Sequence, residues 1–137
     1  EDQNTALHYF AAKFRSPNCA VPFKLFLSKG ANVNAQNRNG ETPLHKAVFN
    51  NTVRLLMVNL LLQAGADVNM QNALGETSLH SAARLGREDL LKALMTAGAD
   101  PEIQDRKGQI PLDWAVTTNN QKFITVLQKA KELTEWL

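Results

Sequence analysis

Residues 40–45 read Gly-Glu-Thr-Pro-Leu-His, and residues 75–80 repeat the pattern as Gly-Glu-Thr-Ser-Leu-His. A degenerate copy, Gly-Gln-Ile-Pro-Leu-Asp, occupies residues 108–113, and residues 3–8 read Gln-Asn-Thr-Ala-Leu-His, without the glycine. The leucine shared by the four copies stands at positions 7, 44, 79 and 112, which are 37, 35 and 33 residues apart. A motif that returns at nearly constant spacing is the signature of a repeat protein.

A second motif follows each of the first three copies. It reads Gly-Ala-Asn-Val-Asn at residues 30–34, Gly-Ala-Asp-Val-Asn at 65–69 and Gly-Ala-Asp-Pro-Glu at 98–102. Together the two motifs resemble the ankyrin repeat, whose period is about 33 residues. The resemblance implies an all-α ankyrin-repeat solenoid of about four helix-turn-helix repeats joined by projecting β-hairpin loops. The repeats are expected at about 1–36, 37–71, 72–104 and 105–137.

Each unit has the residues that two short helices need. Thr42 precedes the first apolar turn, where its hydroxyl can cap a helix, and Pro43 fits the first helical position. Gly65 is expected to end the second helix in the left-handed conformation. Leu61 and Leu94 lie in the second helices, and we expect both side chains to be buried between neighbouring repeats.

The repeats differ in length. The helix-ending glycine stands 22 positions after the motif histidine in the first repeat (8 to 30), 20 positions after it in the second (45 to 65) and 18 in the third (80 to 98). The surplus residues are expected between the two helices of a repeat, near 15–22 and near 50–53. Loops accept such additions with a small entropic penalty.

Composition excludes several classes of protein. A formal charge of +2 with 13 acidic residues leaves no basic stripe, which argues against nucleic acid as a partner. The apolar run around Leu55–Leu62 is interrupted by Asn59 and is too short to insert into a membrane. The single cysteine, Cys19, cannot form an internal disulfide and favours a reducing compartment. The expected location is the cytoplasm, with the nucleus as the alternative.

Three histidines, His8, His45 and His80, recur once in each of the first three repeats and superficially resemble metal ligands. No cysteine or carboxylate cluster completes a zinc shell around them. The resemblance implies a structural role, in which each imidazole ties one hairpin to the next. The sequence also lacks a phosphate-binding glycine loop, a His-Glu-x-x-His motif and a Gly-x-Ser-x-Gly motif. It therefore predicts no enzyme, no catalytic residue, no cofactor and no metal.

One modification signal stands out. Leu61 followed by Asp67-Val68-Asn69 resembles the pattern at which asparaginyl hydroxylases modify ankyrin repeats. The alternative is that Asn69 shapes the turn with its side chain. We favour the turn, and Asn69 stays a candidate for modification.

The resemblance implies that partners bind a concave face made of the hairpin tips and the exposed side of the first helices. Mapped onto this sequence, the face consists of Phe49, Met70, Leu74, Glu76, Arg84, Leu85, Arg106, Lys107 and Trp114. The large apolar members beside an arginine have the composition of an interaction hot spot. Two members have alternatives: Phe49 could instead seal its own helix pair, and Trp114 could belong to the core.

These observations predict a scaffold or adaptor module that binds another protein or a peptide segment, or a neighbouring domain of the same chain. The alternative is an intramolecular spacer or regulatory arm. In that case the helix from Lys122 to Leu137, which ends on Trp136 and Leu137, would pack against a following domain of a larger protein.

Overall fold

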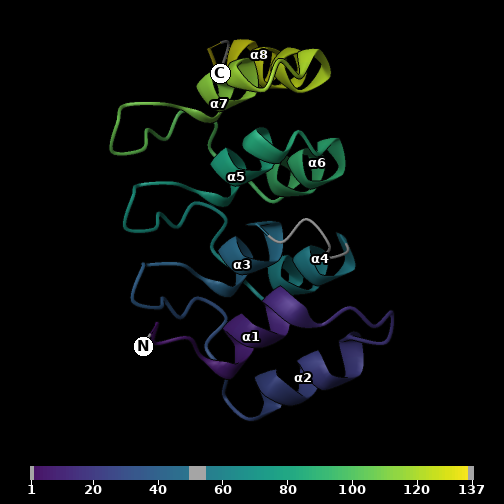
Figure 1. The fold of residues 1–137 in the computed structure, drawn as a ribbon. Helices are drawn as coiled ribbons and strands as arrows, with labels where there is room; N and C mark the ends of the chain where they lie inside the picture. Colours follow the sequence, from purple (N-terminus) through teal and green to yellow (C-terminus); the bar gives the residue numbers. More distant parts are fainter. Residues whose placement is uncertain (1, 50–54, 136–137) are drawn as a thin grey trace.

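The computed structural model describes residues 2–49 and 55–135, and these residues form eight helices and no strand. The helices follow one another as pairs along the chain (Figure 1). They are α1 (Ala6–Lys13), α2 (Ala20–Ser28), α3 (Pro43–Phe49), α4 (Leu55–Gln63), α5 (Ser78–Leu85), α6 (Glu88–Thr96), α7 (Pro111–Thr117) and α8 (Gln121–Glu135). The predicted all-α repeat architecture is confirmed.

The helix pairs stack into an elongated column (Figure 1). The first helices pack in the order α1, α3, α5, α7, and the second helices α4, α6 and α8 form a parallel row behind them. The loops between pairs, residues 29–42, 64–77 and 97–110, all project from the same side. We call these loops the fingers. Each repeat therefore contacts its neighbours in sequence, as in other solenoids.

The core runs along the whole column between the two rows of helices. Leu61 and Leu94 are completely buried, which confirms the sequence-based prediction. Ala47 and Ala82 are equally buried in the first helices, where their small side chains let α3 and α5 approach closely. Truncation of such fully buried leucines costs about 2–5 kcal/mol, so this core is the main source of stability.

The helix ends follow the sequence pattern. The His45 N–H donates to Thr42 Oγ1 at 3.3 Å, so Thr42 caps α3, and Pro43 is the first residue of that helix. Gly65 follows α4 with φ of +92°, and the next N–H, of Ala66, donates to the Leu61 carbonyl at 3.0 Å. A residue with a Cβ adopts this φ only with strain, which explains the glycine.

The first insertion is shorter than expected. The connection between α1 and α2 covers residues 14–19, so Pro22 does not belong to it but to the first turn of α2. Proline fits there because the first amides of a helix have no intrahelical acceptor. Cys19 precedes the helix and is buried in the core. The second expected insertion, 50–53, lies outside the described residues.

Candidate partner-binding surface

The three repeated histidines each join the start of a first helix to the following finger. Each Nε2 lies within hydrogen-bond distance of a carbonyl of the following finger: His8 with Glu41 (2.7 Å), His45 with Glu76 (3.0 Å) and His80 with Gln109 (2.9 Å). The Thr42 backbone N–H donates to His45 Nδ1 at 3.1 Å, and the other two rings have the same contact. A carbonyl only accepts, so Nε2 carries a hydrogen, whereas Nδ1 accepts from a backbone N–H and carries none; in this geometry each ring is neutral. The structural role implied for these histidines is confirmed.

The finger tips are also linked directly. The Ala73 N–H donates to the Asn39 carbonyl at 2.8 Å, and the Arg106 N–H donates to the Leu74 carbonyl at 3.0 Å. Gly40 permits this approach, because a Cβ there would lie 2.9 Å from the Ala73 nitrogen. The fingers are therefore held at fixed spacing, and side chains at their tips have defined positions relative to the first helices.

A stack of three side chains crosses the first helices. The Arg84 guanidinium carbon, on α5, lies 5.2 Å from the ring centroid of Phe49 on α3 and 5.2 Å from that of Trp114 on α7. Phe49 is 60% exposed, so it does not seal its helix pair. Trp114 packs partly against the core, and its Nε1 donates to Asp105 Oδ2 at 3.1 Å. Trp114 is thus both a core and a surface residue.

Leu74 stands exposed at a finger tip between two hollows. It is 60% exposed. One hollow, of about 190 Å³, also has Phe49 and Arg84 in its wall, and the other, of about 150 Å³, has Trp114 and Lys107. Pockets for small organic ligands usually have about 300–1,000 Å³. Each of these hollows is therefore of a size for single side chains of a partner.

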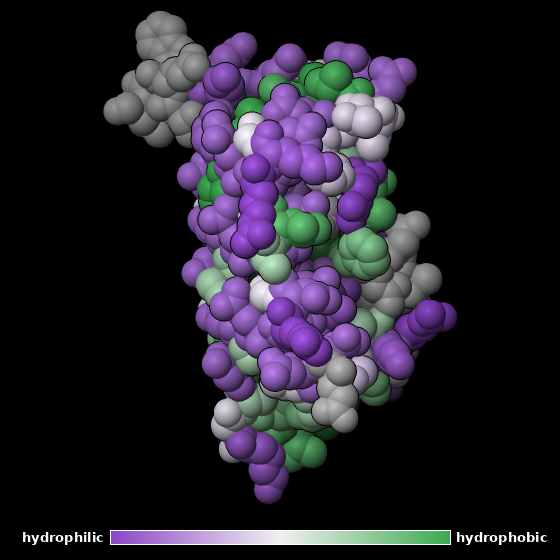
Figure 2. Space-filling model, turned by 60° about the vertical axis from the view of Figure 1, so that its left-hand side comes forward, coloured by the Kyte–Doolittle hydropathy of each residue, from purple (hydrophilic) through white to green (hydrophobic). Residues whose placement is uncertain are grey.

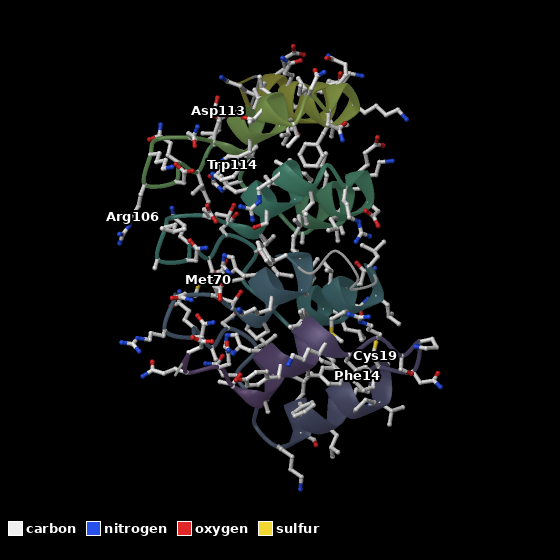
Figure 3. The ribbon with its side chains drawn as sticks, viewed as in Figure 1. Phe14, Cys19, Met70, Arg106, Asp113 and Trp114 are labelled. Atoms are coloured by element: carbon white, nitrogen blue, oxygen red, sulfur yellow. The ribbon has the colours of Figure 1, made fainter. Side chains whose placement is uncertain are left out.

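The remaining predicted residues surround these hollows to different degrees. Glu76 borders both, and Arg106 and Lys107 border the second. Figure 3 shows Arg106 at the outer edge of its finger and Trp114 where the finger joins the helices. Met70 and Leu85 are half-buried and line neither hollow. We call the seven sequence-predicted residues that border the hollows the finger face: Phe49, Leu74, Glu76, Arg84, Arg106, Lys107 and Trp114.

The side of the molecule that carries the fingers is mainly hydrophilic. Figure 2, which brings this side forward, shows hydrophilic residues over most of the surface, with hydrophobic residues near its middle and at its upper and lower ends. Phe49 and Leu74 are among the large hydrophobic residues that the structure leaves exposed. An apolar centre with a polar surround is the usual anatomy of a protein interface.

Three titratable groups near the finger face have shifted pKa values. Burial raises the pKa of Glu41, but hydrogen bonds from Lys46 and Asn37 outweigh it and hold this pKa below the ordinary 4.5. Burial lowers the pKa of His45 below 6.5, in agreement with its neutral state. Burial also raises the pKa of Asp105, but its N–H donors outweigh this and place it below 3.8.

Asn69 makes a bridge between repeats. Its Nδ2 donates to the Gly98 carbonyl at 3.3 Å, and its Oδ1 accepts from the Asp100 N–H at 2.8 Å. Asn34 makes the equivalent bonds with Gly65 and Asp67 one repeat earlier. These bonds give Asn69 a structural role, while its modification stays an untested prediction.

A larger hollow, of about 770 Å³, lies between α4 and α6 on the second helices. Among the described residues, its wall contains Leu55, Leu62, Glu88 and Lys92 and has neither an aromatic residue nor an arginine. Protein interfaces are usually anchored by such residues, so the finger face is the better candidate. The part of the chain that the structure describes holds no cluster of three or more metal-ligating side chains, and none of its helices is long and apolar enough to cross a membrane.

Residues 1–72 and 54–135 match the family model described as ankyrin repeats (3 copies). The chain belongs to the ankyrin-repeat family. The match extends over nearly the whole sequence and agrees with the stacked helix pairs and projecting fingers. It confirms the family that the two repeated motifs indicated.

Several relatives of this chain are much longer proteins from Dictyostelium discoideum. A probable serine/threonine-protein kinase is 61% identical over 137 residues, 100% of this chain and 16% of that protein. Stress-activated protein kinase alpha is 60% identical over 138 residues, 100% of this chain and 22% of the kinase. Ankyrin repeat-containing protein kinase A is 56% identical over 114 residues, 81% of this chain and 8% of its own length. This chain thus spans less than a quarter of each.

Sequence reasoning placed the members of the finger face but missed the stack that joins three of them. Phe49 and Arg84 both stand five residues after the motif leucine, at 44 and 79, so their alignment was visible in the sequence. Trp114 stands only two residues after Leu112 and reaches Arg84 from an earlier turn. Asp105 was also missed, although it replaces the asparagine found at positions 37 and 72 and fixes the indole.

Proposed function

We propose that this ankyrin-repeat region is a protein-protein interaction module that binds its partner on the finger face. The observation that carries the proposal is the exposed Leu74 between two hollows whose walls contain an arginine and two aromatic rings. Apolar side chains beside arginine and tryptophan are typical of binding hot spots. The module itself performs no catalysis, and it acts in the cytoplasm or, as the alternative, in the nucleus.

The partner is another protein or peptide segment, or a neighbouring domain of the same chain. Rigid fingers support either choice, since hydrogen bonds between tips fix the positions of the side chains before binding. The kinase relatives support the neighbouring-domain form, because their matched segments are small parts of much longer proteins.

The experiment compares proteins captured from a cell lysate by the wild-type chain, by Leu74→Asp and by Lys129→Gln. Lys129 is exposed on α8, on the second row of helices, and serves as the control. A buried aspartate at a hot spot should reduce capture roughly tenfold or more. The melting temperature should stay nearly unchanged, because residue 74 is a surface position. Equal capture by the wild type and Leu74→Asp would contradict the proposal.

A second candidate function is a spacer or regulatory arm that packs through α8. Leu133 on this helix is 67% exposed, and the helix, with 15 residues, is longer than the others in the described ranges. In a longer protein that contains this region, hydrogen exchange of α8 should slow when the following domain is present, and Leu133→Asp should reverse that protection. Unchanged exchange rates with and without the following domain would exclude this candidate.

A further inference from the structure

Arg84 contacts two aromatic rings, but no hydrogen-bond acceptor engages its N–H groups among the described residues. Its guanidinium carbon lies over the ring of Phe49 and over the ring of Trp114, 5.2 Å from each centroid. Among the described residues, no acceptor lies within hydrogen-bond distance of this guanidinium and no carboxylate pairs with it. Aromatic rings stabilise a cation through its face and do not satisfy N–H groups that point outward in its plane.

The carboxylates around the same hollows are already engaged. Glu41 Oε2 lies 2.7 Å from Lys46 Nζ and accepts from Asn37 Nδ2 at 2.9 Å. Asp105 accepts from the backbone N–H groups of Lys107 and Gln109, both at 2.9 Å, and from the Trp114 indole. These acids therefore stabilise their own fingers and do not neutralise Arg84.

Glu76, which borders both hollows, also forms a hydrogen bond within its own finger. Its Oε2 accepts from Asn72 Nδ2 at 3.5 Å. Arg106 and Lys107 extend from the neighbouring finger without an ion pair within the described residues. The surface thus presents three cations, grouped around one exposed leucine, whose charged groups have no carboxylate partner in the part of the chain that the structure describes.

We propose that the finger face recognises an acidic peptide segment in which an Asp or Glu side chain lies beside a large apolar side chain. The carboxylate accepts hydrogen bonds from the Arg84 guanidinium, and the apolar side chain covers Leu74. The inference rests on the proposed function and adds the chemistry of the partner to it. Arg106 and Lys107 attract the same segment through longer-range charge.

The stack explains why arginine suits this position. A planar guanidinium can present two parallel N–H donors to a carboxylate, which a lysine ammonium cannot do. Contacts with two rings restrict the rotamers of Arg84 before binding, so less conformational entropy is lost when the carboxylate arrives. Phe49 and Trp114 are thus positioning residues, and Arg84 makes the contact.

The test uses a displayed library of random linear 12-residue peptides as the probe, selected on the whole 137-residue chain. The expected result is enrichment of Asp or Glu next to a large apolar residue. A selected peptide is then synthesised with its acid intact and with Asp→Asn or Glu→Gln, and both are titrated by fluorescence anisotropy. Loss of a charge-assisted hydrogen bond should weaken the amide version roughly 10- to 100-fold on the wild-type chain.

Arg84→Met should remove this discrimination, so that both peptides bind it with similar affinity. Lys129→Gln, which deletes the same charge from α8, should retain the full discrimination. Arg84→Lys keeps the charge and most of the stem, and should retain only part of the preference. If Arg84→Met melts at a lower temperature than the wild type, the acid-over-amide preference of Arg84→Lys decides whether Arg84 binds the carboxylate.

The outcomes separate the inference from the function on which it rests. If Leu74→Asp weakens the selected peptides but the acid and amide versions bind the wild type equally, the acidic-segment inference is overturned and the interaction module stands. Selection of peptides that lack Asp and Glu would likewise overturn the acidic-segment inference and leave the interaction module standing. If Leu74→Asp and Arg84→Met both leave binding unchanged, the contact lies elsewhere, and the proposed function of this face is overturned as well.

Discussion

His45 on α3 and Arg84 on α5 belong to the same column of first helices, but their nitrogen atoms have opposite surroundings. The His45 ring is buried, and both its nitrogens have partners, one in its own repeat and one in the next finger. The Arg84 guanidinium lies between two rings at the surface and has no acceptor among the described residues. The fold satisfies both ring nitrogens of His45, whereas the N–H groups of Arg84 have no acceptor among the described residues.

The difference separates stability from recognition within one repeat. A buried polar group must be hydrogen-bonded, because an unsatisfied one costs about 1–3 kcal/mol. A surface group can keep its donors in water without that penalty and exchange water for a partner later. Substitutions of buried core residues should therefore lower the free energy of unfolding, whereas substitutions on the finger face should mainly alter binding.

The largest effect is expected from Leu94→Ala in the buried layer. Leu94 on α6 is completely buried, and its truncation leaves a cavity between helix pairs. We expect a loss of about 2–5 kcal/mol in the free energy of unfolding, measured by urea denaturation. Leu74→Ala, at an exposed leucine, is the matched control and should change stability by less than about 0.5 kcal/mol. Similar losses of stability in the two variants would contradict the distinction between the buried core and the finger face.

A smaller loss is expected from His45→Ala. The substitution leaves the Thr42 N–H and the Glu76 carbonyl without their ring partner, at a cost of roughly 1–3 kcal/mol. Asp113 is the control, since it occupies the histidine position of the last repeat and its carboxylate accepts from the Ile110 N–H of its own finger at 2.9 Å. Asp113→Ala should behave as the loss of a helix cap, about 1 kcal/mol. Equal losses would show that the link between fingers contributes nothing.

Acidification should weaken the same link. Burial lowers the pKa of His45 below the 6.5 of an unfolded chain, so below pH 6.5 the unfolded state binds more protons than the folded state. This contribution to stability is present above pH 6.5 and is lost as the pH falls through 6.5 toward the folded pKa. Urea denaturation at pH 7.5 and 5.5 should give a smaller difference for His45→Gln than for the wild type. An identical difference would assign the pH effect to other groups.

Most of the fold could be predicted from the sequence because it depends on local, repeated chemistry. Thr42 and Pro43 start a helix, Gly65 ends one, and Leu61 has the spacing of a buried face. Each signal acts within a few residues and recurs with the repeat. The first insertion was placed less well, because Pro22 fits a loop and the first turn of a helix equally well.

The candidate site was less predictable, because its contacts join three repeats. Phe49 turns outward, where its ring meets the guanidinium of Arg84, 35 residues later in the sequence. Leu85 was expected beside Leu74 on the surface, but the structure half-buries it and places it outside both hollows. The residue types were visible in the sequence, whereas their side-chain directions followed from packing between repeats.

Among the substitutions expected to lower stability, Phe49→Leu should have the smallest effect, and it tests the surface side of the comparison. The ring is mainly exposed, and its contact with Arg84 is worth about 0.5–1 kcal/mol at most at an exposed site. The melting temperature should therefore hardly change, while Arg84 becomes free to adopt other rotamers. The acid-over-amide preference of a selected peptide should fall, although the charge of Arg84 is still present. Phe49→Tyr, which restores an aromatic face, should restore the preference, and this rescue distinguishes positioning of the guanidinium from simple loss of apolar area. If Phe49→Leu keeps the full preference, Trp114 alone is sufficient to hold Arg84, and the two-ring account of this arginine is wrong.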